Sequence, residues 1–375
     1  MQIMKIRKIN ISGLNKNIEI SHDFHEDINI VTGLNGAGKT TLLKVIWYLI
    51  SSNAERIAPE IEFNYIELVT DFYRVILDKQ PSYIEWTFED FQTGKITNKK
   101  YKDFEDPTPR SSIEELNQMT RDFRTSSLYF PTFRRIEGGY SMTPIRRTSR
   151  SGRLVYRDIY RFDNIQDELA SLADRISVDR HKFICSISTN DIVSLLTRRY
   201  AHISESLNTQ YKSISTYIIN QIQDAKPKMK DSGSSEALSL LNRIQERADT
   251  MNEERDKLLH PFTILSELTD KLFKHRGIRL QAVTLGDSAD AIDSSILSAG
   301  EKQLLSFLCY NAFSENSIVF IDEPELSLHP DWQRRLFSIL IEQQPTNQFI
   351  VATHSPFIYT KYSDKEIPML EDKGA

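Results

Sequence analysis

The sequence predicts an α/β fold, in which a mixed sheet carries an antiparallel β flap and a helical hairpin is inserted into the chain. Apolar strands alternate with helical segments around a glycine-rich stretch, GLNGAGKT, at residues 33–40. Such alternation is typical of a mostly parallel sheet covered by helices. Runs with strand periodicity follow this stretch, and a long apolar stripe with helical spacing occupies the middle of the chain.

The part of the chain before residue 135 is predicted to be rich in strands. The runs IEFNYIELVTD, YRVILDK and YIEWTFED alternate apolar and polar residues, as strands of an antiparallel flap do. The other elements expected here are paired strands 2–12 and 17–21, strand 28–32, a helix from Thr40 to about Ile50, helix 112–124 and strand 126–130.

Core elements resume after the middle of the chain. They are predicted as strand 278–285, a helix that follows LSAGEKQ and ends near Phe313, strand 317–322, helix 331–343 and strand 348–352. We therefore divide the chain into three parts. Residues 1–135 and 277–375 form an α/β head, and residues 136–276 form an arginine-rich loop plus a helical insertion.

The helical insertion is predicted from apolar residues that are spaced three or four apart. They are Ile192, Leu196, Tyr200, Ile203, Leu207, Tyr211, Ile214, Ile218 and Ile222. This spacing places one apolar stripe on one helix face. After the polar KPKMKDSGSS stretch the pattern resumes with Leu238, Leu241, Ile244, Ala248 and Met251, which indicates an antiparallel return helix. The stripe packs against that return helix and the head, or it serves as an arm that binds another protein or dimerises.

Composition excludes several classes of protein. The chain has 375 residues, a formal net charge of −5 and two cysteines, Cys185 and Cys309. Two cysteines are too few for a disulfide framework or a zinc site. Since there is no uncharged apolar run of 18 residues and no signal-peptide pattern, we expect a cytoplasmic protein without a membrane span.

The stretch at 33–40 has the G-x-x-x-x-G-K-T spacing of a phosphate-binding loop. Glycines let successive backbone N–H groups turn toward phosphate oxygens, and the following helix points its positive dipole end at them. Lys39 is expected to contact the β- and γ-phosphates, and Thr40 to offer its hydroxyl to Mg²⁺. The residues predicted to bind nucleotide here are Gly33, Asn35, Gly36, Ala37, Gly38, Lys39, Thr40 and Thr41.

Two carboxylates follow the apolar run Ile318–Ile321, and a histidine follows the strand QFIVAT. Asp322 is expected to hold Mg²⁺, and Glu323 to orient and polarise the attacking water. His354 could donate a hydrogen bond to the γ-phosphate. The predicted catalytic residues are therefore Glu323, His354 and Lys39, and the predicted metal ligands are Thr40 and Asp322.

The segment Leu297–Gln303, LSAGEKQ, begins a predicted helix. The Ser298 hydroxyl and the N–H groups near Gly300 and Glu301 could bind an anion there. Taken alone, the segment could also be an ordinary capped helix start.

Taken together, GLNGAGKTT, LSAGEKQLL, FIDEPELSLHP and ATHSP resemble the AAA15/AAA21-type ABC ATPases, relatives of the OLD, RecF and SMC proteins. The segment YFPTFRRIEGG at 129–139 strengthens the resemblance, whereas the helical region is covered poorly. The resemblance implies two heads that sandwich two ATP molecules. Ser298 and Gly300 of one head would face residues 33–41, Asp322, Glu323 and His354 of the other. It also implies ATP hydrolysis with Mg²⁺ and at least a homodimer.

This chain departs from the transporter members of the class at two places. YFPTFRR lacks their glutamine, so Thr132 or Arg134 is expected in its place, and ELSLHP puts His329 where they have an aspartate. The 21 residues after His354 are too few for the nuclease of OLD proteins. Stand-alone members of this branch often belong to anti-phage systems such as Septu, PARIS and certain retrons. The leading hypothesis is a nucleotide-gated sensor or scaffold that controls a separate effector, such as a nuclease.

The alternative is a RecF/SMC-like ATPase of DNA repair or recombination. Its evidence is an arginine-rich segment comprising Arg134, Arg135, Arg146, Arg147, Arg150, Arg153, Arg157 and Arg161. These side chains could follow nucleic-acid phosphates, contact an acidic protein surface or simply face solvent. A transporter subunit is disfavoured by the long helical insertion between Lys39 and Ser298.

Overall fold

The computed structural model describes residues 3–101, 110–132, 135–136, 171–187, 189–225, 233–273 and 297–369. These residues divide into two units. One is an α/β head made from the described residues up to 188 and from 297 onward, and the other is a helical unit that begins at Thr189. The arginine-rich segment, apart from the backbone of Arg135, and the predicted strand 278–285 lie outside the described residues.

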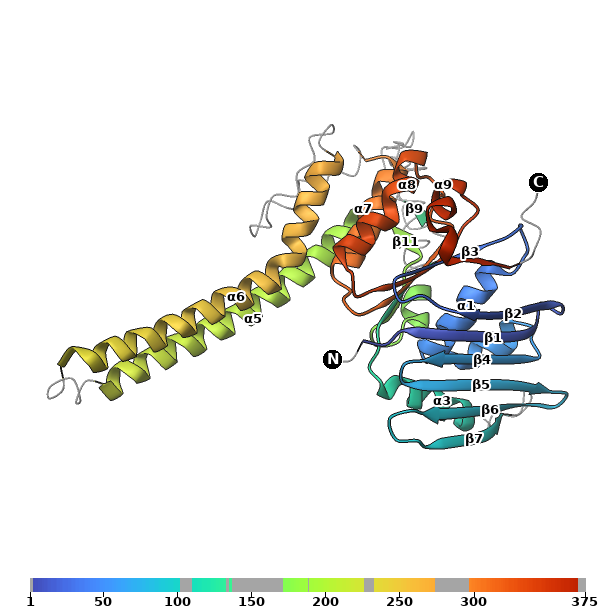
Figure 1. Cartoon of the computed structure of the whole chain (residues 1–375), viewed down its shortest axis with the longest axis horizontal. Coiled ribbons are helices and arrows are strands. Elements are labelled where there is room, and N and C mark those ends of the chain that lie inside the picture. The colour runs from blue at the N-terminus through green and yellow to red at the C-terminus, as the bar shows by residue number, and fades with distance from the viewer. Residues whose placement is uncertain are drawn as a thin grey trace, which may run out of the picture. The chain divides into compact units, whose positions relative to one another are not determined.

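The head contains an antiparallel sheet with the strand order β2-β1-β4-β5-β6-β7 (Figure 1). Its strands are β1 (Ile6–Leu14), β2 (Ile18–Asp23), β4 (Tyr65–Thr70), β5 (Tyr73–Gln80), β6 (Tyr83–Asp90) and β7 (Ile96–Tyr101). Side chains of β4, β5 and β6 alternate between buried and partly exposed, as the period-two pattern predicted. The expected antiparallel flap is confirmed.

A second sheet is parallel throughout and has the order β10-β8-β12-β13-β3-β14. Its strands are β3 (Ile28–Thr32), β8 (Ser127–Phe130), β10 (His181–Phe183), β12 (Ile318–Asp322), β13 (Gln348–Ala352) and β14 (Glu366–Pro368). Every residue of β3, β8, β12 and β13 is buried, in keeping with their continuous apolar runs. The carboxyl ends of these strands meet at one edge of the sheet.

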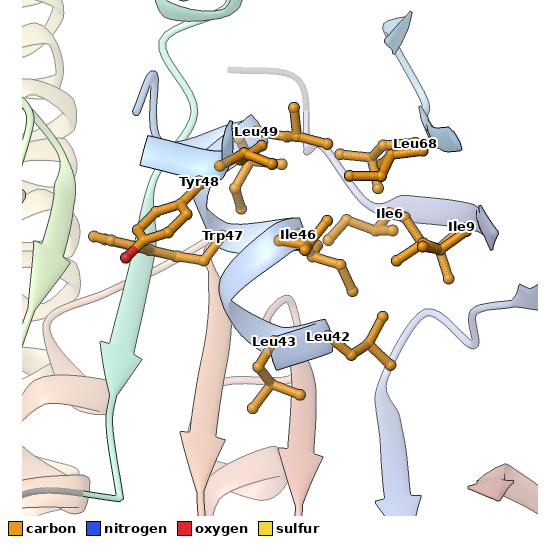
Figure 2. Packing of buried hydrophobic residues seen from close by; sticks show 14 of the residues in the cluster. Ile6, Ile9, Leu42, Leu43, Ile46, Trp47, Tyr48, Leu49 and Leu68 are labelled. Atoms are coloured by element: carbon orange, nitrogen blue, oxygen red, sulfur yellow. The ribbon is translucent and has the colours of Figure 1, made fainter. Parts of the chain in front are cut away.

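Helix α1 (Lys39–Ile50) joins the two sheets. In Figure 2, Leu42 and Ile46 point toward Ile6 and Ile9 of β1, while Trp47 points away from them. The Trp47 indole N–H donates to Ser127 Oγ of β8 at 3.0 Å. A helix that is apolar on most sides is stable only when it is covered on those sides. Because α1 packs against both sheets, it holds the end of the phosphate loop in a fixed position relative to them.

Shorter elements complete the head. They are a 3₁₀ helix at Ala54–Arg56, α2 (Ile57–Glu60), α3 (Arg110–Asp122), α7 (Ala299–Ala312), α8 (Pro330–Gln343), α9 (Pro356–Tyr359), a 3₁₀ helix at Thr360–Lys365, and a small parallel pair formed by β9 (Arg135–Ile136) and β11 (Ser186–Ile187). The predicted helix 112–124 is thus found at 110–122, and the helix after LSAGEKQ ends at Ala312.

The helical unit contains α5 (Thr189–Ala225) and α6 (Gly233–Phe273), which run side by side (Figure 1). The predicted stripe of α5 is buried at Ile192, Leu196 and Leu207, whereas Tyr211 and Ile222 are exposed. Leu238 and Leu241 of α6 are also exposed, and Leu240 is buried in their place. The predicted phase of the return helix was therefore wrong at its beginning and correct at Met251, which is buried.

Helix α6 continues across Pro261. Proline removes one backbone donor and crowds the preceding turn, which kinks a helix. Figure 1 shows α6 changing direction along its length. Among the described residues, no helix combines the length and the apolar character that crossing a bilayer requires.

Candidate nucleotide site at the carboxyl edge of the parallel sheet

The phosphate loop lies between β3 and α1 and ends at Gly38, the N-cap of α1. Gly38 has a φ of +87°, in the left-handed region where other residues are strained. A Cβ there would also meet Ile18 Cδ1 at 3.1 Å. Within the described chain no side chain caps α1, so the N–H groups of its first turn are oriented for an anion.

Lys39 is buried beneath this loop, with 6% of its surface exposed. Its ammonium donates to the carbonyls of Gly33 at 2.9 Å and Leu34 at 3.0 Å, and lies 2.6 Å from His354 Nε2. Because an ammonium has only donors, Lys39 is the donor and His354 Nε2 the acceptor in this contact. Burial lowers the pKa of Lys39.

Thr40 and Asp322 come together at the same edge. The Thr40 hydroxyl donates to Asp322 Oδ2 at 2.8 Å, and the Thr132 hydroxyl donates to the same oxygen. Thr132, one of the two residues expected in place of the transporter glutamine, therefore contacts one of the two predicted metal ligands. Arg134 lies outside the described residues. Hydroxyl and carboxylate oxygens are ligands that Mg²⁺ prefers.

The described residues contain no group of three or more His, Cys, Asp or Glu that could hold a metal ion by themselves. Mg²⁺ sites of nucleotide-binding proteins commonly use only one or two protein ligands, with phosphate and water oxygens completing the shell. The donor set of Thr40 and Asp322 therefore fits Mg²⁺ that arrives with a nucleotide.

Glu323 follows Asp322 in a strained backbone conformation, with a φ of +49°. Its N–H donates to the carbonyl of Ala352 at 2.8 Å, and its Oε1 lies 3.9 Å from His354 Nε2. Burial, followed by the charges of Asp322 and Glu325, raises the pKa of the Glu323 carboxyl. A carboxylate that is partly shielded from water and has a raised pKa suits general-base work.

Glu325 belongs to the same site and was not predicted. Its carboxylate accepts hydrogen bonds from the Thr353 hydroxyl at 2.9 Å and from the His354 N–H at 2.7 Å. The only sequence signal was its position as the third acid of IDEPE. The sequence alone does not show that an acid in a polar turn belongs to a site. The role of Glu325 is visible only once the end of β13 lies beside it.

The segment Leu297–Gln303, called the signature segment below, leads into α7, with Ser298 as the N-cap. Ser298 N and Oγ both donate to Glu301 Oε2, at 2.8 and 2.7 Å, and Glu301 N donates back to Ser298 Oγ at 3.3 Å. This reciprocal arrangement is a capping box. The start of α7 is therefore a capped helix start, which was the alternative interpretation of LSAGEKQ. A capped helix start is compatible with an anion-binding role.

Helix α7 contacts the loop that follows β12. Gln303 Nε2 donates to the carbonyl of Pro324 at 3.1 Å. A Cβ at Gly300 would lie 2.2 Å from the Ser327 carbonyl oxygen, so glycine is required there by the close approach of two backbones. The loop that follows β12 therefore connects α7 to Asp322 and Glu323.

The other predicted loop residues surround this core. Asn35 and Gly36 are exposed and Ala37 is buried. The Thr41 hydroxyl accepts from Asn15 Nδ2 at 3.5 Å. The predicted residues Lys39, Thr40, Asp322, Glu323 and His354 are brought together at the sheet edge, whereas Ser298 and Glu301 bond to each other at the start of α7.

A family model described as "AAA ATPase domain" (AAA_15) matches residues 4–359. The chain belongs to this family. The match spans both parts of the head and the helical unit between them, so this AAA_15 chain carries a nucleotide-binding domain whose sequence is interrupted by the helical hairpin.

Curated relatives are similar to most or part of this AAA_15 chain. It is 22% identical over 402 residues to the "Retron Vc95 probable ATPase" of Vibrio cholerae serotype O1 biovar El Tor, with 98% of this chain and 74% of the relative covered. It is 27% identical over 146 residues to the "Retron Ec83 probable ATPase" of Escherichia coli, with 34% of this chain and 27% of the relative covered.

Solved structures were also matched. A Pyrococcus furiosus Smc head domain with an extended coiled coil, bound to the C-terminal domain of ScpA, has a TM-score of 0.36 at 14% identity and covers 95% of this chain and 91% of its own. An SmcHead bound to the C-winged helix domain of ScpA has a TM-score of 0.38 at 13% identity, with the same coverage.

Proposed function

We propose that this chain binds ATP with Mg²⁺, dimerises through its heads and hydrolyses ATP, and that its nucleotide state controls a separate effector, such as a nuclease, in bacterial anti-phage defence. The observation that carries the enzymatic part is the convergence of Lys39 with His354 at 2.6 Å and of Thr40 with Asp322 at 2.8 Å. These pairs join three strand ends at one edge of the parallel sheet, where ligands of open α/β sheets bind.

Each residue has a chemical role in this proposal. The N–H groups at the start of α1 and Lys39 bind the phosphates. Thr40 and Asp322 hold Mg²⁺, which neutralises charge on the phosphate oxygens when it is bound. Glu323 orients and polarises the attacking water, and His354, within 3.9 Å of Glu323, donates to the γ-phosphate.

Support for the defence role comes from the two relatives whose names place them with retrons, one of which aligns with 98% of this chain. The effector and the homodimer are parts of the same proposal. Dimerisation is supported by Ser298, an exposed N-cap at a helix N-terminus, because such a terminus can receive an anion from a second head.

Trans-complementation tests the shared site. Ser298→Arg leaves the phosphate loop intact and blocks the start of α7, whereas Lys39→Ala does the reverse. Each variant alone should lack ATPase activity. A mixture should regain activity, because one site of each heterodimer then combines an intact phosphate loop with an intact signature. A mixture as inactive as its components would contradict a site shared between heads.

Phage plating tests the cellular role. Cells that carry this gene with its neighbours should resist phage, and Lys39→Ala should abolish the resistance while the protein remains expressed. Equal plating on cells with and without the intact set of genes would contradict the defence role. Strong, salt-sensitive binding of the purified chain to duplex DNA would instead favour a repair or recombination ATPase.

A further inference from the structure

Glu325 links two loops that follow neighbouring strands. It lies three residues beyond the end of β12, and its two carboxylate oxygens accept from consecutive residues after β13. Oε2 accepts from the Thr353 hydroxyl at 2.9 Å, and Oε1 from the His354 N–H at 2.7 Å. Thr353 is fully buried, and its Oγ1 also accepts from the N–H of Ser355 at 3.0 Å. Residues 353–355 are thus fixed on the carboxylate of Glu325.

A second connection holds the same two loops. Gln333 of α8 accepts from the Ser355 hydroxyl at 2.5 Å, and its amide donates to the carbonyls of Leu328 at 2.7 Å and Glu325 at 3.4 Å. Gln333 therefore holds the backbone of Glu325, while the side chain of Glu325 holds the backbone of His354. Glu325 acts as a rigid spacer between the two strand ends.

The position of the His354 ring depends on this spacer. Its Nε2 lies 2.6 Å from Lys39 Nζ and 3.9 Å from Glu323 Oε1. A histidine side chain has only two rotatable bonds, so its ring moves with the backbone from which it projects. Whatever displaces the N–H of residue 354 displaces the ring relative to both catalytic neighbours.

We propose that Glu325 is a positioning residue for ATP hydrolysis, which holds the backbone of His354 so that the imidazole reaches the phosphate site beside Lys39 and Glu323. This inference rests on the proposed function. It assigns Glu325 no contact with substrate. The positioning effect passes through His354, because the carboxylate of Glu325 bonds to the backbone of that residue. The charge of Glu325 also raises the pKa of Glu323, so kcat is compared at a pH where Glu323 is ionised in every variant.

The chemistry of the two bonds predicts how substitutions rank. Alanine removes both acceptors. Glutamine keeps one oxygen for the His354 N–H, but its amide nitrogen cannot accept the Thr353 hydroxyl proton, so it should restore only part of the function. Asp331→Asn is a matched control, because Asp331 is an exposed acid at the start of α8 that bonds to Arg334.

The experiment is a double-mutant cycle on the full chain, with kcat measured in an ATPase assay and ATP affinity measured with a fluorescent analogue. Glu325→Ala should lower kcat by about tenfold to a hundredfold, as small misplacements of catalytic groups do, and change affinity far less. Glu325→Gln should fall between alanine and wild type. Asp331→Asn should match wild type.

The combination with His354→Ala decides the mechanism. Glu325→Ala should cost nothing further in kcat when His354 is already alanine, since the residue it positions is gone. An equal additional loss in that background would overturn the inference, as would a wild-type kcat in Glu325→Ala. If Glu325→Ala does not fold, Glu325→Gln in the same cycle answers the question.

Failure of the proposed function looks different. A wild-type chain that hydrolyses ATP no faster than Lys39→Ala overturns the ATPase proposal and this inference together. A wild-type chain that hydrolyses ATP while the cycle is additive overturns the role of Glu325 alone.

Discussion

The sequence predicts that two helix N-termini of the head bind nucleotide. These two termini differ in how their backbone N–H groups are satisfied. Helix α1 begins at Gly38, and no side chain caps it in the described chain. Helix α7 begins at Ser298, and the side chains of Ser298 and Glu301 complete a capping box there. One terminus presents its N–H groups to an anion, whereas the other already holds a carboxylate.

This difference assigns different tasks to the two ends. The start of α1 lies among Lys39, Asp322 and His354, the side chains to which we assign phosphate and Mg²⁺ in the proposed function. The start of α7 contacts the loop after β12 through Gly300 and Gln303. We therefore expect variants at α1 to act on chemistry and variants at α7 to act on folding and assembly.

Glu323→Gln should give the largest effect, because it removes the general base while preserving size. Hydrolysis should fall by about a hundredfold to ten-thousandfold, with ATP binding retained. The raised pKa of Glu323 means that its basic form is lost at a higher pH than for an ordinary glutamate. The acid limb of kcat/KM should therefore lie above the usual glutamate range. Hydrolysis by Glu323→Gln at the wild-type rate would remove Glu323 from the chemistry.

Lys39→Ala should weaken ATP binding by about tenfold to a hundredfold, the value of losing one or two charge-assisted hydrogen bonds. Isothermal titration with ATP and Mg²⁺ measures this directly. Lys44→Ala, on the same helix, is the control for loss of a positive charge and should bind as wild type does. Comparable losses in the two variants would mean that general electrostatics, rather than the phosphate loop, governs affinity.

Gly300→Ala should lower the free energy of unfolding by about 1–3 kcal/mol, as overpacking does, because the new Cβ would lie 2.2 Å from the Ser327 carbonyl oxygen. Chemical denaturation provides the measurement, and Ala299→Ser, at the exposed neighbouring position, is the control. Unchanged stability in Gly300→Ala would show that α7 and the loop after β12 separate easily.

Glu301→Ala should produce the smallest effect, a loss of about 0.5–1 kcal/mol from the capping box and the helix dipole. Glu301→Gln should retain most of this stability, because glutamine also serves at that position of a capping box. If the two variants lose equal stability, the capping interaction contributes nothing, and the contrast between the two helix starts disappears.

Much of the head could be predicted because its signals are local. Apolar runs that end in Asp322 or precede His354 mark buried parallel strands, and parallel strands bring their carboxyl ends to one edge. The phosphate-loop spacing located Lys39 and Thr40 in the same way. The sequence also offered two residues, Thr132 and Arg134, in place of the transporter glutamine. Of these, Thr132 donates a hydrogen bond to Asp322.

What could not be predicted depends on contacts between distant segments. Glu325 gains its role only when Thr353 and His354, from a different strand end, lie beside it. Helical spacing alone fitted Leu238 and Leu241 as well as Leu240, yet Leu240 is buried and the other two are exposed. Periodicity limits which helix faces can be buried, and tertiary packing decides which of them is buried.

The strand order of the parallel sheet has a consequence for synthesis on the ribosome. Strand β3, which leads into the phosphate loop, pairs only with β13 and β14 within the described sheet. Both partners are translated more than 300 residues later, after the helical unit. The antiparallel sheet can form early from local hairpins, but β3 gains its neighbours last. A nascent chain should therefore acquire nucleotide binding only after β13 and β14 have left the ribosome, in a single late step.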